Sequence, residues 1–233
     1  MLAALHNAFD PALFWEYRVV LLTGLLQNII IFLESAVLAI LLAFVVGIAS
    51  LSRHGPVRWA AIAYAEFFRN TPEYVLLVWV YFVLPLVIGK ALGTKVNFSP
   101  HVAAVMGLGV AYSGFLSETV RAGLRSVSLG QTESALSLGM SGFTALRRIV
   151  LPQAVRRMLP EAVNQLVSLF KSTTIVSLIA VQDIMYQVSM ISVAELRPVP
   201  LYTGAALLYC IVIVLATQLF QQLTERWRRR GWA

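Results

Sequence analysis

The sequence predicts an all-α integral membrane protein that crosses the bilayer about five times. Hydrophobic residues make up 59% of the 233 residues, charged residues make up only 12%, and the mean hydropathy is +0.78. A soluble domain usually carries about a quarter charged residues. The few charges also gather between long apolar segments, which is the pattern of a chain with several membrane spans.

Five apolar segments define the expected spans. The first is longer than a hydrocarbon core of about 30 Å requires, so it must tilt, break or project from the bilayer. The third is rich in glycine, which allows helices to approach closely, and the fourth is unusually polar. In chain order the spans are about residues 19–51, 73–89, 100–120, 160–181 and 200–223. We expect residues 1–233 to form a single transmembrane domain.

The basic residues fall mostly on one side of these spans. Thirteen lie after the first span, after the third and in the tail: Arg53, Arg58, Arg69, Arg121, Arg125, Arg147, Arg148, Arg156, Arg157, Arg226, Arg228, Arg229 and Arg230. Four lie on the other side, at Arg18, Lys90, Lys95 and Arg197, and Lys171 alone falls inside a span. The positive-inside rule then places the N-terminus outside and the C-terminus in the cytoplasm. This alternation requires an odd number of spans, which agrees with five.

Composition also argues against several kinds of site. The net charge of +7 does not indicate nucleic-acid binding, because the arginines lie in short segments between spans, where membrane orientation explains them. Cys210 is the single cysteine, and His6, His54 and His101 are far apart, so we expect neither a disulfide nor a metal site. The N-terminus lacks a basic region followed by an apolar core, so no cleavable signal peptide is expected.

The segment 128–157, on the cytoplasmic side, is too polar to span a membrane and too periodic to be a slack loop. We expect Thr132 to cap a short helix with Glu133 in its first turn, and Gly139 to end that helix in a left-handed conformation. Ser141 is expected to cap a second helix, which carries an apolar stripe and which Pro152 should stop. The stripe consists of Leu146, Ile149 and Val150, beside a basic rim of Arg147 and Arg148.

An apolar face on a cytoplasmic helical hairpin is expected to be shielded from water. On physical grounds two arrangements are equally reasonable. The face packs against the protein's own helices or in the lipid headgroup layer, or a partner protein docks on it.

The stretch ESALSLGMSGFTALRRIVLPQ resembles the EAA loop of binding-protein-dependent ABC importers. The matching positions are Glu133, Ser134, Ala135, Gly139, Ile149, Leu151 and Pro152, and Ser134 replaces the usual alanine. Three further stretches, at 67–85, 112–135 and 159–179, are similar to permeases of the polar amino-acid branch, although Asn70 and Phe115 depart from its usual residues. The four matches follow one another in the expected order and cover nearly the whole chain.

The resemblance implies an inner-membrane permease subunit of an ATP-driven importer for polar amino acids, with the type I permease fold. It implies that the loop docks on a separate ATP-binding subunit, and it turns the choice between the two arrangements firmly toward docking. The implied coupling residues are Glu133, Ala135, Gly139, Ser141, Ile149, Leu151 and Pro152. It also implies a second permease subunit, identical or related, and an extracytoplasmic solute-binding protein. ATP and magnesium would be held by the partner ATPase and no cofactor by this chain, in which we find no phosphate-binding loop and no catalytic residue set.

Ionisable groups inside spans are costly and usually functional. The predicted pathway residues are Lys171, Glu118, Arg121, Asn164, Ser172 and Thr173. The Lys171 ammonium suits the α-carboxylate of an amino acid, and the alternative is a buried ion pair with Glu118 or Glu161. The resemblance makes Glu118 a candidate for the substrate's amino group or for a gate, and the alternative is a salt bridge to Arg121, three residues later.

Other polar residues in the spans have more than one interpretation. Asn164, Ser172 and Thr173 either line the pathway or tie helices together, and packing is the commoner use. For Glu34, in the first span, an inter-span hydrogen bond or a protonated state is expected. Import of an opine or an ectoine-like osmolyte stays open as an alternative function, as do an ion-gradient carrier, for which no internal repeat is found, and a membrane scaffold.

Overall fold

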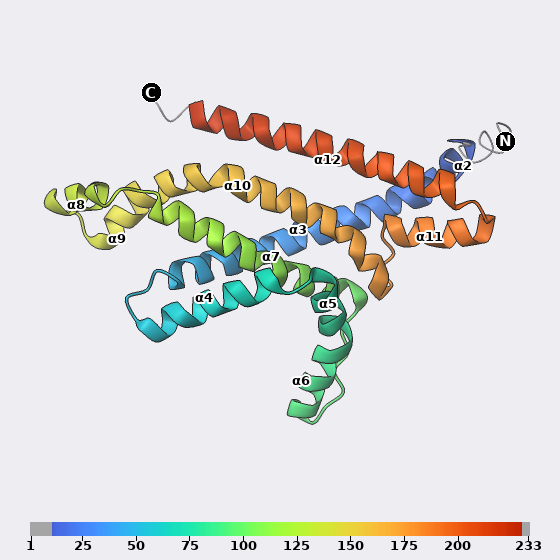
Figure 1. Ribbon diagram of the computed structural model, residues 1–233, viewed down its shortest axis with the longest axis horizontal. Coiled ribbons are helices and arrows are strands. Elements are labelled where there is room, and N and C mark those ends of the chain that lie inside the picture. The colour runs from blue at the N-terminus through green and yellow to red at the C-terminus, as the bar shows by residue number, and fades with distance from the viewer. Residues whose placement is uncertain (1–10, 230–233) are drawn as a thin grey trace. The chain divides into compact units, whose positions relative to one another are not determined.

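The computed structural model describes residues 11–229, and every regular element in that range is a helix. His6 and Arg230, both considered above, lie outside the described residues. Figure 1 labels the α-helices. In chain order the elements are α2 (Pro11–Glu16), α3 (Arg18–Ala49), α4 (Gly55–Asn70), α5 (Glu73–Val78), the π-helix η1 (Trp79–Val83), α6 (Leu84–Leu92), α7 (Pro100–Arg125), α8 (Leu129–Ser137), α9 (Gly142–Ala145), the π-helix η2 (Leu146–Val150), α10 (Leu151–Ser172), the 3₁₀ helix η3 (Thr173–Ile179), α11 (Ile184–Glu195) and α12 (Pro198–Arg229).

Within residues 11–229, five helical stretches are long and apolar enough to cross a membrane, which confirms the predicted number of spans. They are Arg18–Ala49, Glu73–Leu92, Pro100–Arg125, Gly142–Ile179 and Pro198–Phe220. The first contains 32 residues in one unbroken helix, which at about 1.5 Å per residue is about 48 Å long. Of the three ways to fit this long segment to a bilayer, a break is therefore excluded, and tilting or projection remains.

The fourth stretch begins much earlier than the sequence predicted, and the expected stop at Pro152 is wrong. Pro152 lies in the first turn of α10, where its missing N–H falls directly after the π-helical turn η2, and the helix continues. Pro160, the expected start of the span, lies inside α10. Proline is tolerated in a membrane helix where neighbouring groups satisfy the freed carbonyl. The second helix of the hairpin and the fourth span are thus consecutive segments of one helical stretch.

The chain divides into two compact units, each built from three parts of the sequence. Unit 1 contains residues 11–36, 72–109 and 167–216, and unit 2 contains residues 37–71, 110–166 and 217–229. Four helices, α3, α7, α10 and α12, run from one unit into the other.

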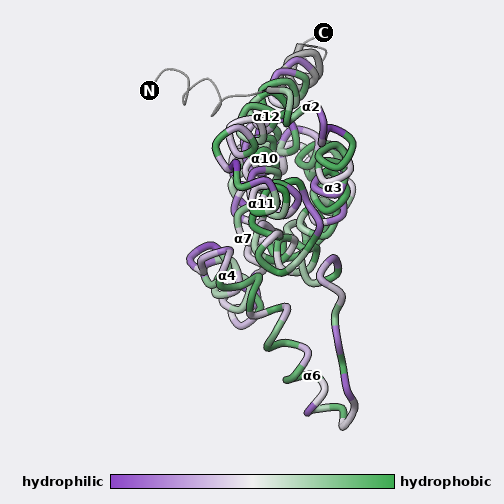
Figure 2. Tube along the Cα trace, turned by 90° about the vertical axis from the view of Figure 1, so that its right-hand side faces the viewer, coloured by the Kyte–Doolittle hydropathy of each residue, from purple (hydrophilic) through white to green (hydrophobic). Residues whose placement is uncertain are grey.

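Unit 1 has an apolar core where α3, α11 and α12 meet. The core residues are Leu13, Leu21, Leu25, Phe170, Ile184, Val188, Ile191, Leu201, Ala205 and Tyr209. A Cβ atom on Gly24 would lie 2.8 Å from the Ile184 backbone, so only glycine allows α3 to pass this close to the start of α11. Figure 2 shows α6, also in this unit, as mostly hydrophobic, whereas the segment that follows it is partly hydrophilic.

Unit 2 joins α4, the second half of α7, the hairpin α8–α9 and the first part of α10. Glycines of α7 permit close packing here: a Cβ atom on Gly114 would lie 3.1 Å from the Phe68 side chain on α4, and one on Gly123 would lie 2.9 Å from Met158 on α10. This confirms the packing role expected for glycine in the third span. Figure 1 shows α8 and α9 beyond the ends of α7 and α10.

Candidate functional site: the α8–α9 hairpin and the polar face of the fourth span

The turn between α8 and α9 is closed as the sequence predicted. Gly139 has a φ of +79° and follows the end of α8. The Gly139 N–H donates to the Leu136 carbonyl at 2.9 Å and the Met140 N–H to the Ala135 carbonyl at 3.1 Å, the two bonds of a Schellman motif. Ser141 then caps α9, because its Oγ accepts a bond from the Thr144 N–H at 3.2 Å.

The start of α8 differs from the prediction. Its N-cap is Ser128 and its first residue is Leu129, so Thr132 lies within the helix instead of capping it. The run after Thr132 is periodic, but it does not mark a boundary, because Leu129, Gly130 and Gln131 extend the helix backward by most of a turn.

Each helix of the hairpin buries one alanine. Ala135 of α8 and Ala145 of α9 are both buried, and the two helices are in contact. Small side chains at this position bring the helix backbones together, while Glu133 stays exposed on the outer side of α8. The other predicted coupling residues lie around the second helix: Ile149 and Leu151 are half-buried, and Pro152 is exposed.

Sequence reasoning missed the most exposed apolar side chains of the hairpin. Leu138 and Phe143 flank the Gly139 turn and are 79% and 72% exposed, and Leu129 is similarly exposed. Of the predicted stripe, Leu146 is exposed, whereas Ile149 and Val150 are half-buried. The signal was available, because a large apolar residue on each side of a turn glycine in a water-facing segment has no local partner. Together these side chains leave an uncovered apolar tip on the hairpin.

One face of α10 carries polar side chains that the rest of the chain leaves exposed. These residues, which we call the polar stripe, are Arg157, Glu161, Asn164, Ser168 and Lys171. They are spaced four, three, four and three residues apart, so they lie along a single face of the helix. A stripe with two cations and a carboxylate cannot face hydrocarbon without a large desolvation cost, so it faces water or another protein.

The C-terminal end of this stripe is Lys171, the penultimate residue of α10. Its side chain is exposed, and none of the ion pairs formed within residues 11–229 includes it. The alternative of a pair with Glu118 or Glu161 is therefore absent from the described chain. Ser172 is half-buried, and Thr173 is fully buried, so the Thr173 side chain contributes no surface to the exposed face.

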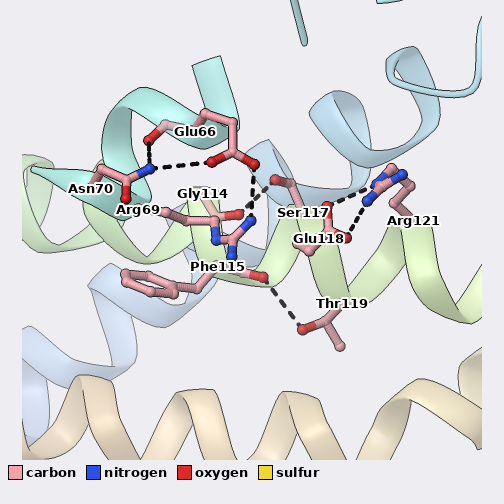
Figure 3. Close-up of polar contacts among 9 residues, drawn as sticks. All are labelled: Glu66, Arg69, Asn70, Gly114, Phe115, Ser117, Glu118, Thr119 and Arg121. Atoms are coloured by element: carbon pink, nitrogen blue, oxygen red, sulfur yellow. Dashed lines mark hydrogen bonds and ion pairs between the residues drawn. The ribbon is translucent and has the colours of Figure 1, made fainter. Parts of the chain in front are cut away.

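Glu118 and Arg121 form a pair within α7, which is the structural alternative expected for them. Arg121 Nε donates to Glu118 Oε2 at 2.7 Å, and its Nη2 donates to Glu118 Oε1, in a bidentate arrangement. On α4, Arg69 and Asn70 bond the carboxylate of Glu66 at 3.2 Å. Figure 3 shows Glu66 and Arg69 of α4 beside Gly114 of α7, and the Glu118–Arg121 pair further along α7. Both Glu118 and Arg121 are partly exposed, so water or a ligand can still reach them.

Glu34 has the inter-span hydrogen bond that was one of its two predicted interpretations. His101 Nε2 lies 2.6 Å from Glu34 Oε2, and Gln27 Nε2 lies 2.9 Å from His101 Nδ1. An amide N–H of Gln27 that donates to Nδ1 leaves the hydrogen on Nε2 to donate to the carboxylate. Gln27 and His101 also line an open pocket of about 420 Å³ in unit 1.

The described residues contain no group of three or more His, Cys, Asp or Glu side chains that could hold a metal ion. The exposed groups of the site offer charge and hydrogen bonding at the polar stripe and apolar surface at the hairpin tip.

Comparisons with known proteins identify the family and the fold of the chain. The family described as "Binding-protein-dependent transport system inner membrane component" matches residues 35–230. The chain is 31% identical over 207 residues to the glutamate/aspartate import permease protein GltK of Escherichia coli O6:H1, covering 88% of this chain and 92% of GltK. It is 31% identical over 200 residues to the arginine transport system permease protein ArtQ of Bacillus subtilis, covering 84% and 87% of the two chains.

Solved structures show the same fold. The crystal structure of an amino acid ABC transporter with histidines matches with a TM-score of 0.83 and 26% identity, over 93% of this chain and 98% of that chain. The inward-facing MetNI methionine ABC transporter matches with a TM-score of 0.74 and 17% identity, over 91% and 98%. These likenesses confirm the predicted fold of an ABC importer permease with several inner-membrane spans. With most of its length matched by the family and by relatives at 31% identity, the chain belongs to the inner membrane components of binding-protein-dependent transport systems.

Proposed function

We propose that this protein is the permease subunit of an ATP-driven importer for polar amino acids, and that residues 1–233 act as one transmembrane domain. The polar stripe of α10 carries the proposal, because a run of exposed polar side chains along a membrane span is what the wall of a water-filled pathway requires. The four helices shared by both units support a single domain. The relatives named above, which are permeases for glutamate, aspartate and arginine, support the substrate class.

The exposed hairpin tip supports coupling to a separate ATP-binding subunit. Leu138 and Phe143 offer apolar surface next to a turn that two hydrogen bonds fix, so a cleft on a partner can bind a preformed shape. Glu133, Ala135, Gly139, Ser141, Ile149, Leu151 and Pro152 build and support this shape, and we assign them to coupling. ATP and magnesium would then be bound by that partner, and this chain would perform no hydrolysis.

The substrate pathway is assigned to the polar stripe and its neighbours. Lys171 and Asn164 lie on the exposed face of α10, and Ser172 adjoins it. In our proposal the Lys171 ammonium receives the substrate carboxylate, and the Glu118–Arg121 pair acts near the cytoplasmic end. An α-carboxylate is shared by all amino acids, so selectivity among them would rest largely with an extracytoplasmic solute-binding protein. Opines and ectoine-like osmolytes carry the same carboxylate and are the alternative substrates.

A pathway wall on one face of a five-span chain needs an opposite wall, which we assign to a second permease subunit, either a copy of this chain or a related one. The charge bias places the N-terminus outside and the C-terminus in the cytoplasm, so that the basic hairpin faces the ATPase.

Reconstitution in liposomes tests the proposal. The chain is combined with its ATP-binding subunit and solute-binding protein, and uptake of a panel of labelled amino acids is measured with ATP and with a non-hydrolysable analogue. We expect uptake that requires hydrolysable ATP and the binding protein. Uptake that ignores ATP would indicate an ion-gradient carrier instead, and the absence of uptake for every amino acid, opine and osmolyte tested would indicate a scaffold.

A further inference from the structure

A cluster of fully buried polar side chains in unit 1 joins the first span to the end of the fourth. It consists of Asn28 in α3, Thr173 at the start of η3 and Asp183 immediately before α11, and each residue has a relative exposure of 0%. Burying three polar side chains costs free energy unless each is hydrogen-bonded. Nothing in the pathway or the hairpin accounts for this cluster.

Asn28 makes the contacts that hold the cluster together. Its Nδ2 donates to the Thr173 carbonyl at 3.2 Å, to Thr173 Oγ1 at 3.1 Å and to Asp183 Oδ2 at 3.1 Å. Its Oδ1 accepts from the Ile184 N–H at 3.2 Å. One side chain of α3 therefore contacts the residue at which α10 changes into a 3₁₀ helix and also the first residue of α11.

The surroundings leave little room for these groups to move. Asp183 Oδ1 accepts from the Tyr186 N–H at 2.9 Å and so caps α11, while Thr173 Oγ1 donates to the Phe170 carbonyl at 2.7 Å. One turn before Asn28, Gly24 brings the backbone of α3 against Ile184. Every side-chain oxygen and nitrogen of the three residues has a partner, so the cluster holds one defined arrangement.

The position of Thr173 determines the direction of Lys171. Residues two apart are separated by about 200° around the axis of an α-helix and by about 240° around that of a 3₁₀ helix. A Thr173 side chain held against α3 therefore directs Lys171 to the opposite side of the helix. In the structure Thr173 is buried and Lys171 is exposed, as this geometry requires.

We propose that Asn28 is a positioning residue for the substrate pathway: by binding Thr173 and Asp183 it fixes the rotation of the end of α10, and with it the direction of the Lys171 ammonium. This inference rests on the proposed function, because it gives Lys171 a role that depends on its facing the pathway. Asn28 itself does not touch the substrate.

A labelling experiment tests the geometry without substrate or ATP. In a Cys210→Ser background, Lys171→Cys is treated in proteoliposomes with a membrane-impermeant thiol reagent, with Asn28 intact or replaced as Asn28→Leu. We expect rapid labelling with Asn28 intact and labelling slower by on the order of tenfold with Asn28→Leu. Ser35→Ala is the matched control, because Ser35 is another buried polar residue of α3, and its Oγ lies 3.5 Å from the Val105 carbonyl oxygen. Equal labelling rates in Asn28 and Asn28→Leu would overturn the proposal.

Transport kinetics give the second readout, with Lys171 retained. Asn28→Leu should raise KM by on the order of tenfold, equivalent to about 1.4 kcal/mol, and leave basal ATPase activity unchanged. Thr173→Val should raise KM in the same way, and Thr173→Ser, which keeps the hydroxyl, should restore most of the affinity. If Asn28→Leu fails to fold, the comparison of Thr173→Val with Thr173→Ser tests the proposal instead. Equal KM values for these two variants would refute the proposal.

The two proposals fail differently. Absence of uptake by the unaltered protein would refute the transport function, whereas normal uptake combined with an unchanged KM in Asn28→Leu would refute the positioning role alone.

Discussion

Phe143 provides the sharpest test of how the hairpin works. Its ring is 72% exposed at the tip, next to Leu138, and it is not needed to close the turn, which Gly139 and Ser141 close through backbone and cap bonds. Phe143→Ala should therefore leave the hairpin folded and remove apolar surface from its tip. We expect weaker association with the ATP-binding subunit and unchanged insertion into the membrane.

The magnitude follows from the exposed area. A phenylalanine side chain buries on the order of 200 Å² when it is fully enclosed. Phe143 is 72% exposed, so about 140 Å² of its side chain is available for a partner to cover. At about 25 cal/mol per Å², covering this area contributes about 3.5 kcal/mol. Truncation to alanine keeps the Cβ atom, and association also orders side chains, so the measured loss should be nearer to 2 kcal/mol, or about thirtyfold in Kd.

The assay is binding of labelled ATP-binding subunit to the permease in nanodiscs, followed across a concentration series. Phe82→Ala is the matched control, because Phe82 is also exposed, at 56%, but lies in the second span. This control should bind with the unaltered Kd. If Phe143→Ala and Phe82→Ala both bind as tightly as the unaltered protein, the hairpin tip is not the docking surface, and the membrane-covered alternative for this segment is supported.

Three further predictions concern other residues. Gly139→Trp should uncouple ATP hydrolysis from uptake. The left-handed conformation at this position costs a non-glycine residue about 1–2 kcal/mol, and the indole adds bulk at an exposed turn. Gly139→Asn, which tolerates this conformation, should retain most uptake per ATP. Lys171→Ala should lower uptake at least tenfold while the ATPase still co-purifies, and unchanged uptake would remove Lys171 from the pathway. Burial raises the pKa of Asp183 to about 6, so the native state holds a proton that the unfolded state has released between about pH 4 and pH 6. Stability should therefore fall by about 3 kcal/mol as the pH rises through that window, and thermal unfolding in detergent should show this slope in the unaltered protein but not in Asp183→Asn.

The sequence was most informative where the cause of a feature is local. Apolar runs of sufficient length predicted five spans, because hydrocarbon thickness sets their length. Gly139 and Ser141 were recognised because a left-handed turn and an N-cap each depend on the residue at a single position. The unusual polarity of the fourth span was also visible, and the structure resolves it into one exposed face of α10.

Features that depend on distant residues were not predictable from one sequence. Asn28 and Asp183 are 155 positions apart and Glu34 and His101 are 67 apart, so no spacing rule connects them. Nothing local distinguishes Asn28 from the other polar residues of the first span, although a buried amide in a span needs several partners. The stop expected at Pro152 was wrong for a different reason: proline in a first turn removes no hydrogen bond when a π-helical turn comes before it.

The continuity of helix from Gly142 to Ile179 connects these observations. Had Pro152 ended the hairpin, a loop would separate the hairpin tip from the fourth span, and it would absorb motion of the proposed partner. No loop lies between Phe143 and Lys171, so in the proposed coupling a displacement of the tip would act on the helix that carries the polar stripe. The departures from α-helical geometry fall at its two ends, in the π-helical turn Leu146–Val150 and the 3₁₀ segment Thr173–Ile179. Such turns often mark places where a helix can bend. Asn28, on α3, holds the second of these places. In our proposal, motion of the fourth span would therefore move Lys171 to a new position, and the Lys171 side chain would not rotate freely away from the pathway.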